Sequence, residues 1–131
     1  MHIIIGGAYN GKRDYVSAML AGREAEWFEG ILPKQSDPDR LIVVAGIEKW
    51  LAKTKLSEAA AIDHVLAAVA GRDVIVILTD IGRGIVPIDA QQRKLRDTCG
   101  RLYQRLMAEA DEVTRIWYGI ANTLKKRGEV L

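Results

Sequence analysis

The sequence predicts an α/β domain of three layers, in which helices cover both faces of a small, mainly parallel sheet. Short apolar runs alternate with helical patterns along the chain. The runs are apolar at nearly every position, which is typical of parallel strands that are buried on both faces. With 131 residues, the chain is long enough for one hydrophobic core, so we expect a single domain over residues 1–131.

The expected strands are short runs whose length favours a strand over a helix. They are His2–Ile5, Leu41–Ala45, Asp73–Thr79 and Val113–Tyr118. The alternation of strands and helices indicates right-handed crossovers between parallel neighbours. The segment Gly30–Arg40 contains two prolines and is expected to be a loop.

Helical patterns lie between and after these runs. We expect helices over Lys12–Gly22, Ser57–Ala70, Asp89–Glu112 and, as a short last helix, Asn122–Arg127. In the third of these, apolar side chains recur every three or four residues from Leu95 to Val113. Cys99 lies on this stripe and is expected in the core. Ser57 is the expected N-cap of the second helix, and Gly71 its stop signal.

The composition narrows the classes of function. A formal net charge of +2 gives no argument for binding to nucleic acid or to a membrane surface. The apolar runs are far too short to span a bilayer. Cys99 is the only cysteine, which excludes an internal disulfide and a cysteine-based metal cluster and is consistent with a cytoplasmic setting.

A glycine-rich turn between the first expected strand and the first expected helix is the sharpest local feature. It consists of Gly6, Gly7, Ala8, Tyr9, Asn10, Gly11, Lys12 and Arg13. Its first seven positions match the phosphate-binding loop (P-loop) pattern of two glycines five apart followed by lysine. Such a turn points backbone N–H groups at an anion, and the following helix adds its positive end. We therefore expect a P-loop NTPase-like fold in which Lys12 contacts the phosphates of ATP or GTP. The alternative is a tight turn that binds nothing.

The last position of the P-loop pattern is occupied differently here. A P-loop has Ser or Thr at this position, and its hydroxyl holds Mg²⁺, whereas this chain has Arg13. A guanidinium has no acceptor atom and cannot ligate a cation. Two alternatives stay open, because Arg13 either binds phosphate directly or obstructs the loop. The sequence thus predicts an anion cradle, assigns no residue to a metal, and leaves Mg²⁺ as an optional cofactor.

Asp80 follows the third expected strand, at the end where open α/β sheets place their ligands. We assign it a catalytic role beside Lys12, as a contact to metal-bound water or to a hydroxyl group. The alternative is a carboxylate that caps the turn. On the long helix, Arg101 and Arg105 share a face and either bind phosphate, pair with acidic residues across subunits, or are simply solvated.

Several further motifs follow the glycine-rich turn in order. They are Val43–Leu51, Thr79–Pro87, Arg93–Asp97, Gly100–Leu106 and Ala110–Val113. This series resembles the adenosylcobinamide kinase / adenosylcobinamide-phosphate guanylyltransferase family of cobalamin assembly. The resemblance implies a cobinamide kinase-like phosphotransferase whose partners are a nucleotide and cobinamide, and it implies a homo-oligomer.

The chain departs from the family pattern on the side where a metal is expected. The family has Ser where this chain has Arg13, and Asp at the end of the second strand where it has Ala45. The Asn-Glu pair of the family matches Thr79 and Asp80, so one carboxylate survives in shortened form. These losses favour an alternative, in which the chain is a non-catalytic nucleotide- or phosphate-binding relative that acts as a regulatory or interaction protein.

The histidine that becomes guanylylated in the family has no counterpart in this chain. The gap that should hold it is filled by Ala25–Arg40, which contains no histidine. The two histidines present are His2, at the start of an expected buried strand, and His64, expected as a surface or half-buried residue of a helix. Because a covalent nucleotidyl intermediate needs a nucleophile, we expect guanylyltransferase activity to be lost.

Overall fold

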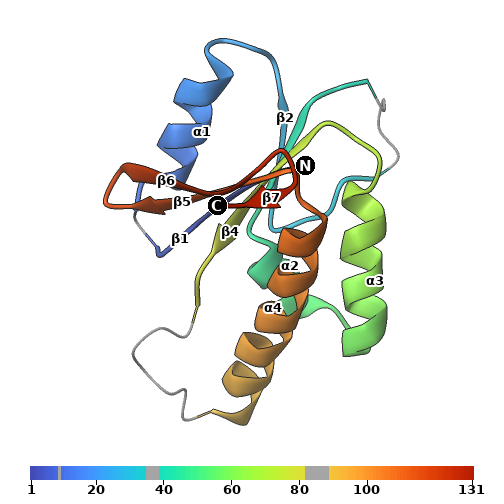
Figure 1. Ribbon diagram of the computed structural model, residues 1–131. Helices are drawn as coiled ribbons and strands as arrows, with labels where there is room; N and C mark the ends of the chain where they lie inside the picture. The colour runs from blue at the N-terminus through green and yellow to red at the C-terminus, as the bar shows by residue number, and fades with distance from the viewer. Residues whose placement is uncertain (9, 35–38, 82–88) are drawn as a thin grey trace.

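A computed structural model describes residues 1–8, 10–34, 39–81 and 89–131 (Figure 1). The strands are β1 (His2–Gly6), β2 (Glu26–Glu29), β3 (Ile42–Ala45), β4 (Val74–Thr79), β5 (Glu112–Trp117), β6 (Ile120–Lys126) and β7 (Glu129–Val130). The helices are α1 (Lys12–Leu20), α2 (Ile47–Lys53), α3 (Glu58–Val69) and α4 (Ala90–Glu109). Among these described residues, no helix is long and apolar enough to cross a membrane.

Within the described residues, all strands join one sheet in the order β2-β3-β4-β1-β5-β6-β7. Every neighbouring pair from β2 to β5 is parallel, whereas β6 and β7 are added antiparallel. The prediction of a mainly parallel sheet is confirmed. The sheet is wider than the four expected strands, because β2 extends one edge and the β6–β7 hairpin the other.

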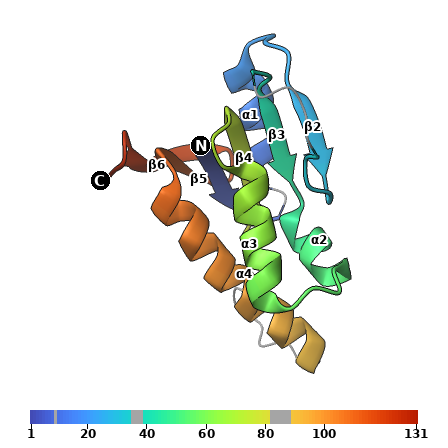
Figure 2. The same ribbon diagram turned by 90° about the vertical axis from the view of Figure 1, so that its right-hand side faces the viewer.

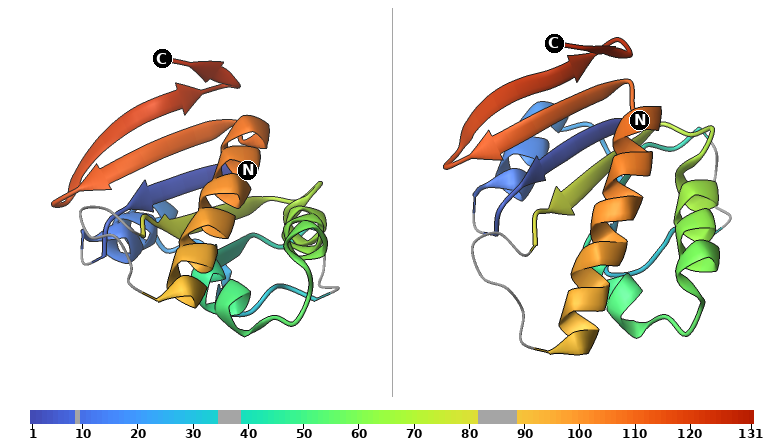
Figure 3. Two further views of the ribbon diagram at one scale, coloured as in Figure 1. Left: turned by 90° about the horizontal axis from the view of Figure 1, so that it is seen from below. Right: turned by 60° about the horizontal axis from the view of Figure 1, so that its bottom comes forward.

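Helices cover both faces of the parallel part of the sheet, which confirms the three layers (Figures 2 and 3). Successive strand residues face opposite sides, so neighbours such as Ile3 and Ile4 enter different cores. Ile4 packs with Val16 of α1 on one face. Ile3 packs on the other face, in a core that also contains α2, α3 and α4. This double burial explains why these strands are apolar at nearly every position.

The helix boundaries follow from local chemistry. The Ser57 hydroxyl accepts a hydrogen bond from the Ala60 N–H at 3.3 Å, which confirms it as the N-cap of α3. Gly71, directly after the C-cap of α3, has a φ of 67°, a conformation that glycine adopts without strain. In α4, Cys99 is only 1% exposed, which confirms its place in the core.

The prediction of a last helix over Asn122–Arg127 is wrong, because these residues lie in and just after β6. Two-residue turns join β5 to β6 and β6 to β7. In the first, Tyr118 and Gly119 have φ of 49° and 76°, and in the second, Arg127 and Gly128 have φ of 53° and 80°. Positive φ at both positions defines the type I′ turn, whose twist suits antiparallel hairpins.

The topology has a switch point, the kind of place where open α/β sheets form a ligand crevice, beside the end of β1. From β1 the chain continues into α1 on one face, and from the adjacent β4 it continues towards α4 on the other face (Figure 1). Gly6 at the end of β1 is in register with Thr79 at the end of β4. Open α/β sheets bind ligands at the ends of two neighbouring strands whose connections run to opposite faces of the sheet.

Candidate functional site

The glycine-rich turn connects β1 to α1 at this switch point, as the sequence predicts. Gly6 is fixed by packing, because a Cβ atom there would lie 2.4 Å from the carbonyl oxygen of Ile116. Gly11 has a φ of 84° and is the N-cap of α1. The N–H of Gly119, in the β5–β6 turn, donates to the carbonyl of Asn10 at 3.1 Å and supports the loop from outside. Tyr9 lies outside the described residues.

Lys12 is buried inside its own loop, with only 4% of its surface exposed. Its Nζ donates a hydrogen bond of 2.6 Å to the carbonyl of Gly7. Burial lowers the pKa of this amine, the charge of Arg13 lowers it further, and the carboxylates of Glu48 and Asp80 oppose both effects. The loop therefore contains a desolvated ammonium group whose nearest described partner is a neutral carbonyl.

Arg13 points to β2 and is engaged there. Its Nε and Nη2 donate hydrogen bonds of 2.6 and 2.8 Å to the two carboxylate oxygens of Glu29. These bonds raise the pKa of the guanidinium and lower that of the Glu29 carboxyl group. Bidentate pairing of this kind fixes the plane of a guanidinium. The sequence reasoning missed Glu29, because it placed no strand before the expected loop.

A cavity of about 520 Å³ opens at the glycine-rich turn. It is lined by the turn and the first residues of α1, by Glu48 and Lys49 of α2, and by Thr79 at the end of β4. The structure thus brings Lys12 together with side chains from the start of α2 and from the end of β4. A cavity of this size lies in the range of small-molecule sites.

Glu48 is the functional candidate that the sequence reasoning overlooked. Its Oε2 atom is buried and has no hydrogen-bond partner among the described residues. Its negative charge acts on Lys12 and Arg13 on one side and on Cys99 and Tyr103 of α4 on the other. The signal in the sequence was a carboxylate three residues beyond the end of β3. The carboxyl ends of parallel strands such as β1 and β3 lie on the same side of the sheet, so this residue lies on the side of the glycine-rich turn.

Asp80 lies next to the loop. Its backbone N–H donates to the carbonyl of Gly6 at 2.9 Å, and its carboxylate charge acts on Lys12. It lines a second cavity, of about 320 Å³, on the side of the loop that faces β5. The structure therefore places Asp80 and Lys12 at one edge of the sheet. Residues 82–88, which include the glycines of the Thr79–Pro87 motif, lie outside the described residues.

Two side chains of α4 support the edge of the sheet without being reactive. The Tyr103 hydroxyl donates to the carbonyl of Thr79 at 2.9 Å, and burial raises the pKa of this phenol. Burial also raises the pKa of the Cys99 thiol to about 12. A thiol that stays protonated near neutral pH is a poor nucleophile, so Cys99 is structural.

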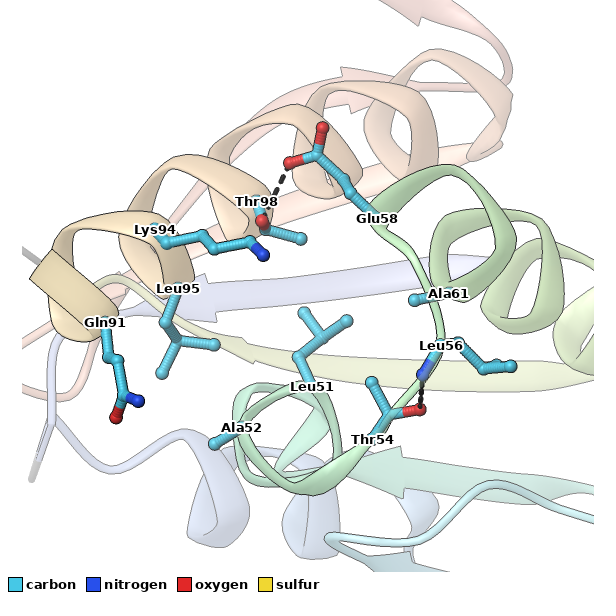
Figure 4. A pocket seen from close by; sticks show the side chains of 10 residues that line it. All are labelled: Leu51, Ala52, Thr54, Leu56, Glu58, Ala61, Gln91, Lys94, Leu95 and Thr98. Atoms are coloured by element: carbon cyan, nitrogen blue, oxygen red, sulfur yellow. Dashed lines mark hydrogen bonds between the residues drawn. The ribbon is translucent and has the colours of Figure 1, made fainter.

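A separate pocket of about 300 Å³ lies between α2, α3 and α4 (Figure 4). At one wall, Glu58 accepts a hydrogen bond of 2.7 Å from the Thr98 hydroxyl and pairs with Arg101. Of the alternatives for Arg101, the structure shows pairing, but with Glu58 of α3 in the same chain. Leu51 lines this pocket, whereas Glu48 lines the cavity at the glycine-rich turn, and the two linings have no described residue in common.

The histidines lie away from the glycine-rich turn. His2 begins β1, at the end of the strand opposite the turn. His64 is exposed on α3 and stacks on Trp50, with ring centroids 5.6 Å apart. Over the described ranges, no group of three or more His, Cys, Asp or Glu side chains is arranged to hold a metal by itself.

The mainly parallel sheet, its two helical layers and the strand–glycine turn–helix unit define a P-loop NTPase-like α/β protein. Residues 23–124 match the family described as cobinamide kinase / cobinamide phosphate guanyltransferase, and the chain belongs to this family. The matched range begins after the glycine-rich turn, so the interpretation of that turn depends on its own geometry.

The curated relatives include the bifunctional adenosylcobalamin biosynthesis protein of Salmonella typhimurium (strain LT2). It is 42% identical to this chain over 52 residues. That segment is 40% of this chain and only 29% of the relative. The similarity is therefore confined to less than a third of the relative's length.

Proposed function

We propose that the chain binds the triphosphate of ATP or GTP at the glycine-rich turn. The observation that supports this proposal most strongly is the buried side chain of Lys12. Its ammonium group lies inside the turn, beside a cavity of about 520 Å³. Bound phosphate oxygens give this charge a partner that the Gly7 carbonyl only partly replaces. The proposed phosphate-binding residues are Gly6, Gly7, Ala8, Tyr9, Asn10, Gly11, Lys12 and Arg13.

Within this set, Arg13 is proposed to act at the rim. Because Glu29 holds its guanidinium, Arg13 does not fill the anion cradle. It contributes a long-range positive charge that Glu29 partly cancels. This reading favours binding over obstruction, and it assigns the main phosphate contact to Lys12.

The proposed reaction is phosphoryl transfer to a hydroxyl group of cobinamide, as in cobalamin biosynthesis. A bond forms between the hydroxyl oxygen and the γ-phosphorus, the bond from that phosphorus to the bridging oxygen breaks, and a nucleoside diphosphate leaves. Asp80 accepts the hydroxyl proton, and Lys12 stabilises charge on the transferred group. Membership of the family supports this substrate class.

Guanylyltransferase activity through a covalent histidine is proposed to be absent. The chain has two histidines, one at the far end of β1 and one exposed on α3. Neither lies where the turn would present a nucleotide. We expect that incubation with labelled GTP leaves no covalently bound nucleotide on the protein of the acid-labile kind that a histidine would form.

A second candidate function is non-catalytic. The cation at Arg13 and the missing carboxylate at Ala45 remove two groups that hold Mg²⁺ in the family pattern, which favours a nucleotide- or phosphate-binding protein with a regulatory or interaction role. Such a protein binds nucleotide without Mg²⁺ and transfers no phosphoryl group to cobinamide. Mg²⁺ dependence therefore separates the two candidates.

We further propose that the chain acts as one nucleotide-binding-like domain in the cytoplasm and forms a homo-oligomer. Exposed apolar side chains on the β5–β6 hairpin support self-association, since Trp117 is 61% and Tyr118 78% exposed. Light scattering after gel filtration measures the mass directly. A monomer at all accessible concentrations contradicts this part of the proposal.

Calorimetric titration with ATP and with GTP, each with and without Mg²⁺, tests nucleotide binding. We expect micromolar binding that is lost in Lys12→Ala. Lys53→Ala is the matched control, because Lys53 is an exposed lysine at the end of α2. Equal binding by the wild-type protein and Lys12→Ala contradicts the proposal.

A further inference from the structure

The cavity at the glycine-rich turn contains a carboxylate with an incomplete environment. Glu48 lines this cavity, and its Oε2 atom is buried without a hydrogen-bond partner among the described residues. Buried charged oxygens are normally satisfied by donors or by cations, because water no longer solvates them. The site therefore has an acceptor oxygen in need of a positively charged or donating partner.

Two of the described cations at the site have other partners, and the third points to solvent. Lys12 donates to the Gly7 carbonyl, and Arg13 makes its two hydrogen bonds to Glu29. Lys49, which also lines the cavity, is an exposed side chain on the turn of α2 next to Glu48. The partner of Glu48 must therefore come from outside the described residues or from a ligand.

Nucleotide binding would add negative charge close to the Glu48 carboxylate. A triphosphate at the glycine-rich turn brings several negative charges next to Glu48 and Asp80, and both carboxylates already act on Lys12. One ammonium group does not neutralise this set. Carboxylates and phosphates coexist at short range when a divalent cation lies between them, and Mg²⁺ is usually held by one or two carboxylates together with substrate phosphates.

We propose that Glu48 binds the Mg²⁺ ion of the nucleotide complex, in place of the hydroxyl that the P-loop pattern has at position 13. The inference rests on the proposed function, because phosphate oxygens complete the coordination of the ion. The donor set fits, since it offers oxygen ligands from Glu48 and from the phosphates, and Mg²⁺ prefers oxygen. A site divided between protein and nucleotide also agrees with the absence of a three-residue metal cluster among the described residues.

The test compares the gain in nucleotide affinity on adding Mg²⁺ between the wild-type protein and Glu48→Gln. We expect Mg²⁺ to strengthen binding to the wild-type protein and the substitution to remove about 10- to 100-fold of that gain, as the loss of a metal-supporting group does elsewhere. In the absence of Mg²⁺, Glu48→Gln should bind nucleotide at least as tightly as the wild-type protein, because one repulsive charge is gone.

The matched control is Asp14→Asn, which removes the same charge from an exposed residue at the same cavity. It should keep the full Mg²⁺ gain. A second readout uses Mn²⁺ in place of Mg²⁺, with free Mn²⁺ measured by electron paramagnetic resonance. The nucleotide complex of the wild-type protein should retain Mn²⁺ more tightly than that of Glu48→Gln, and a thermal melt of both proteins reports whether the variant is folded.

The outcomes distinguish the two proposals. If the wild-type protein binds no nucleotide under any condition, the proposed function fails and the Glu48 site fails with it. If nucleotide binds and Glu48→Gln keeps the wild-type Mg²⁺ gain, or loses no more than Asp14→Asn, only the Glu48 site is overturned. Binding that ignores Mg²⁺ in the wild-type protein also overturns the Glu48 site while leaving nucleotide binding intact.

Discussion

The guanidinium of Arg13 and the carboxylate of Glu29 form a bidentate ion pair that joins the first turn of α1 to the end of β2. Arg13 occupies the position at which the P-loop pattern has a hydroxyl group. The pair holds the guanidinium against β2, the outermost strand on that side of the sheet. The loop itself keeps Lys12 as its internal cation.

The first prediction concerns the pH dependence of this pair. Both side chains are nearly half exposed, so Glu29→Gln should lower the free energy of unfolding by less than about 1 kcal/mol. The pKa of Glu29 is lowered in the folded protein, so the contribution of the pair is complete above the ordinary pKa of glutamate, about 4.3, and is lost as the pH falls through the lower folded value. Urea unfolding of both proteins at pH 7 and at acid pH measures this. A difference that grows on acidification contradicts the prediction.

Gly46 fixes the start of α2 and hence the position of Glu48. It has a φ of 71°, and a Cβ atom there would lie 2.9 Å from the backbone nitrogen of Gly30. Gly46→Ala should therefore destabilise the protein by about 2 kcal/mol or more, from backbone strain and from a backbone clash together. Gly100→Ala is the control, because Gly100 lies within α4 with open space around it and should gain about 0.5–1 kcal/mol. Equal effects at the two positions, measured by urea unfolding, would show that the Gly30–Gly46 approach is unimportant.

Tyr118 adopts an unfavourable backbone conformation at an exposed turn. Its φ is 49°, in a type I′ turn that prefers asparagine at this position. Tyr118→Asn should raise stability by about 0.5 kcal/mol, since the relief of strain exceeds the loss of the tilted contact between Tyr118 and Trp117. The melting temperature is the measurement. Ile120→Asn, one residue beyond the turn, offers no such relief and should not stabilise the protein.

Cys99 provides a reporter of global unfolding. Its thiol is buried, and its pKa is raised to about 12, so the reactive thiolate is scarce at pH 8. A thiol reagent should not modify the native protein over hours and should modify one site per chain in denaturant. Rapid labelling of the native protein at pH 8 is the contrary result, and it would mean that α4 opens locally.

The strands that pack against helices on both faces could be predicted from the sequence, because burial on two faces requires apolar residues at successive positions. Ile3 and Ile4 show this, since they enter opposite cores. Strand β2 was not predictable in this way. It is a short edge strand in which Glu26 and Glu29 flank two aromatic residues, and its value to the site lies in one ion pair.

The antiparallel hairpin at the other edge was missed for a different reason. The two turns of β5–β6–β7 are Tyr-Gly and Arg-Gly rather than Asn-Gly, the dipeptide that signals a hairpin most strongly. Glu48 shows how far the candidate site could be predicted from the sequence. A single glutamate after a strand carries little information until the topology places α2 beside the glycine-rich turn.

The most direct test of phosphate binding at the glycine-rich turn is to follow the backbone amide resonances of the protein as ATP or GTP is added. If Lys12 and its loop hold the phosphates, the largest shifts occur at the amides of Gly7, Gly11 and Lys12, and they vanish in Lys12→Ala. Shifts confined to the pocket between α2, α3 and α4, or no shifts at millimolar nucleotide, would contradict the central claim.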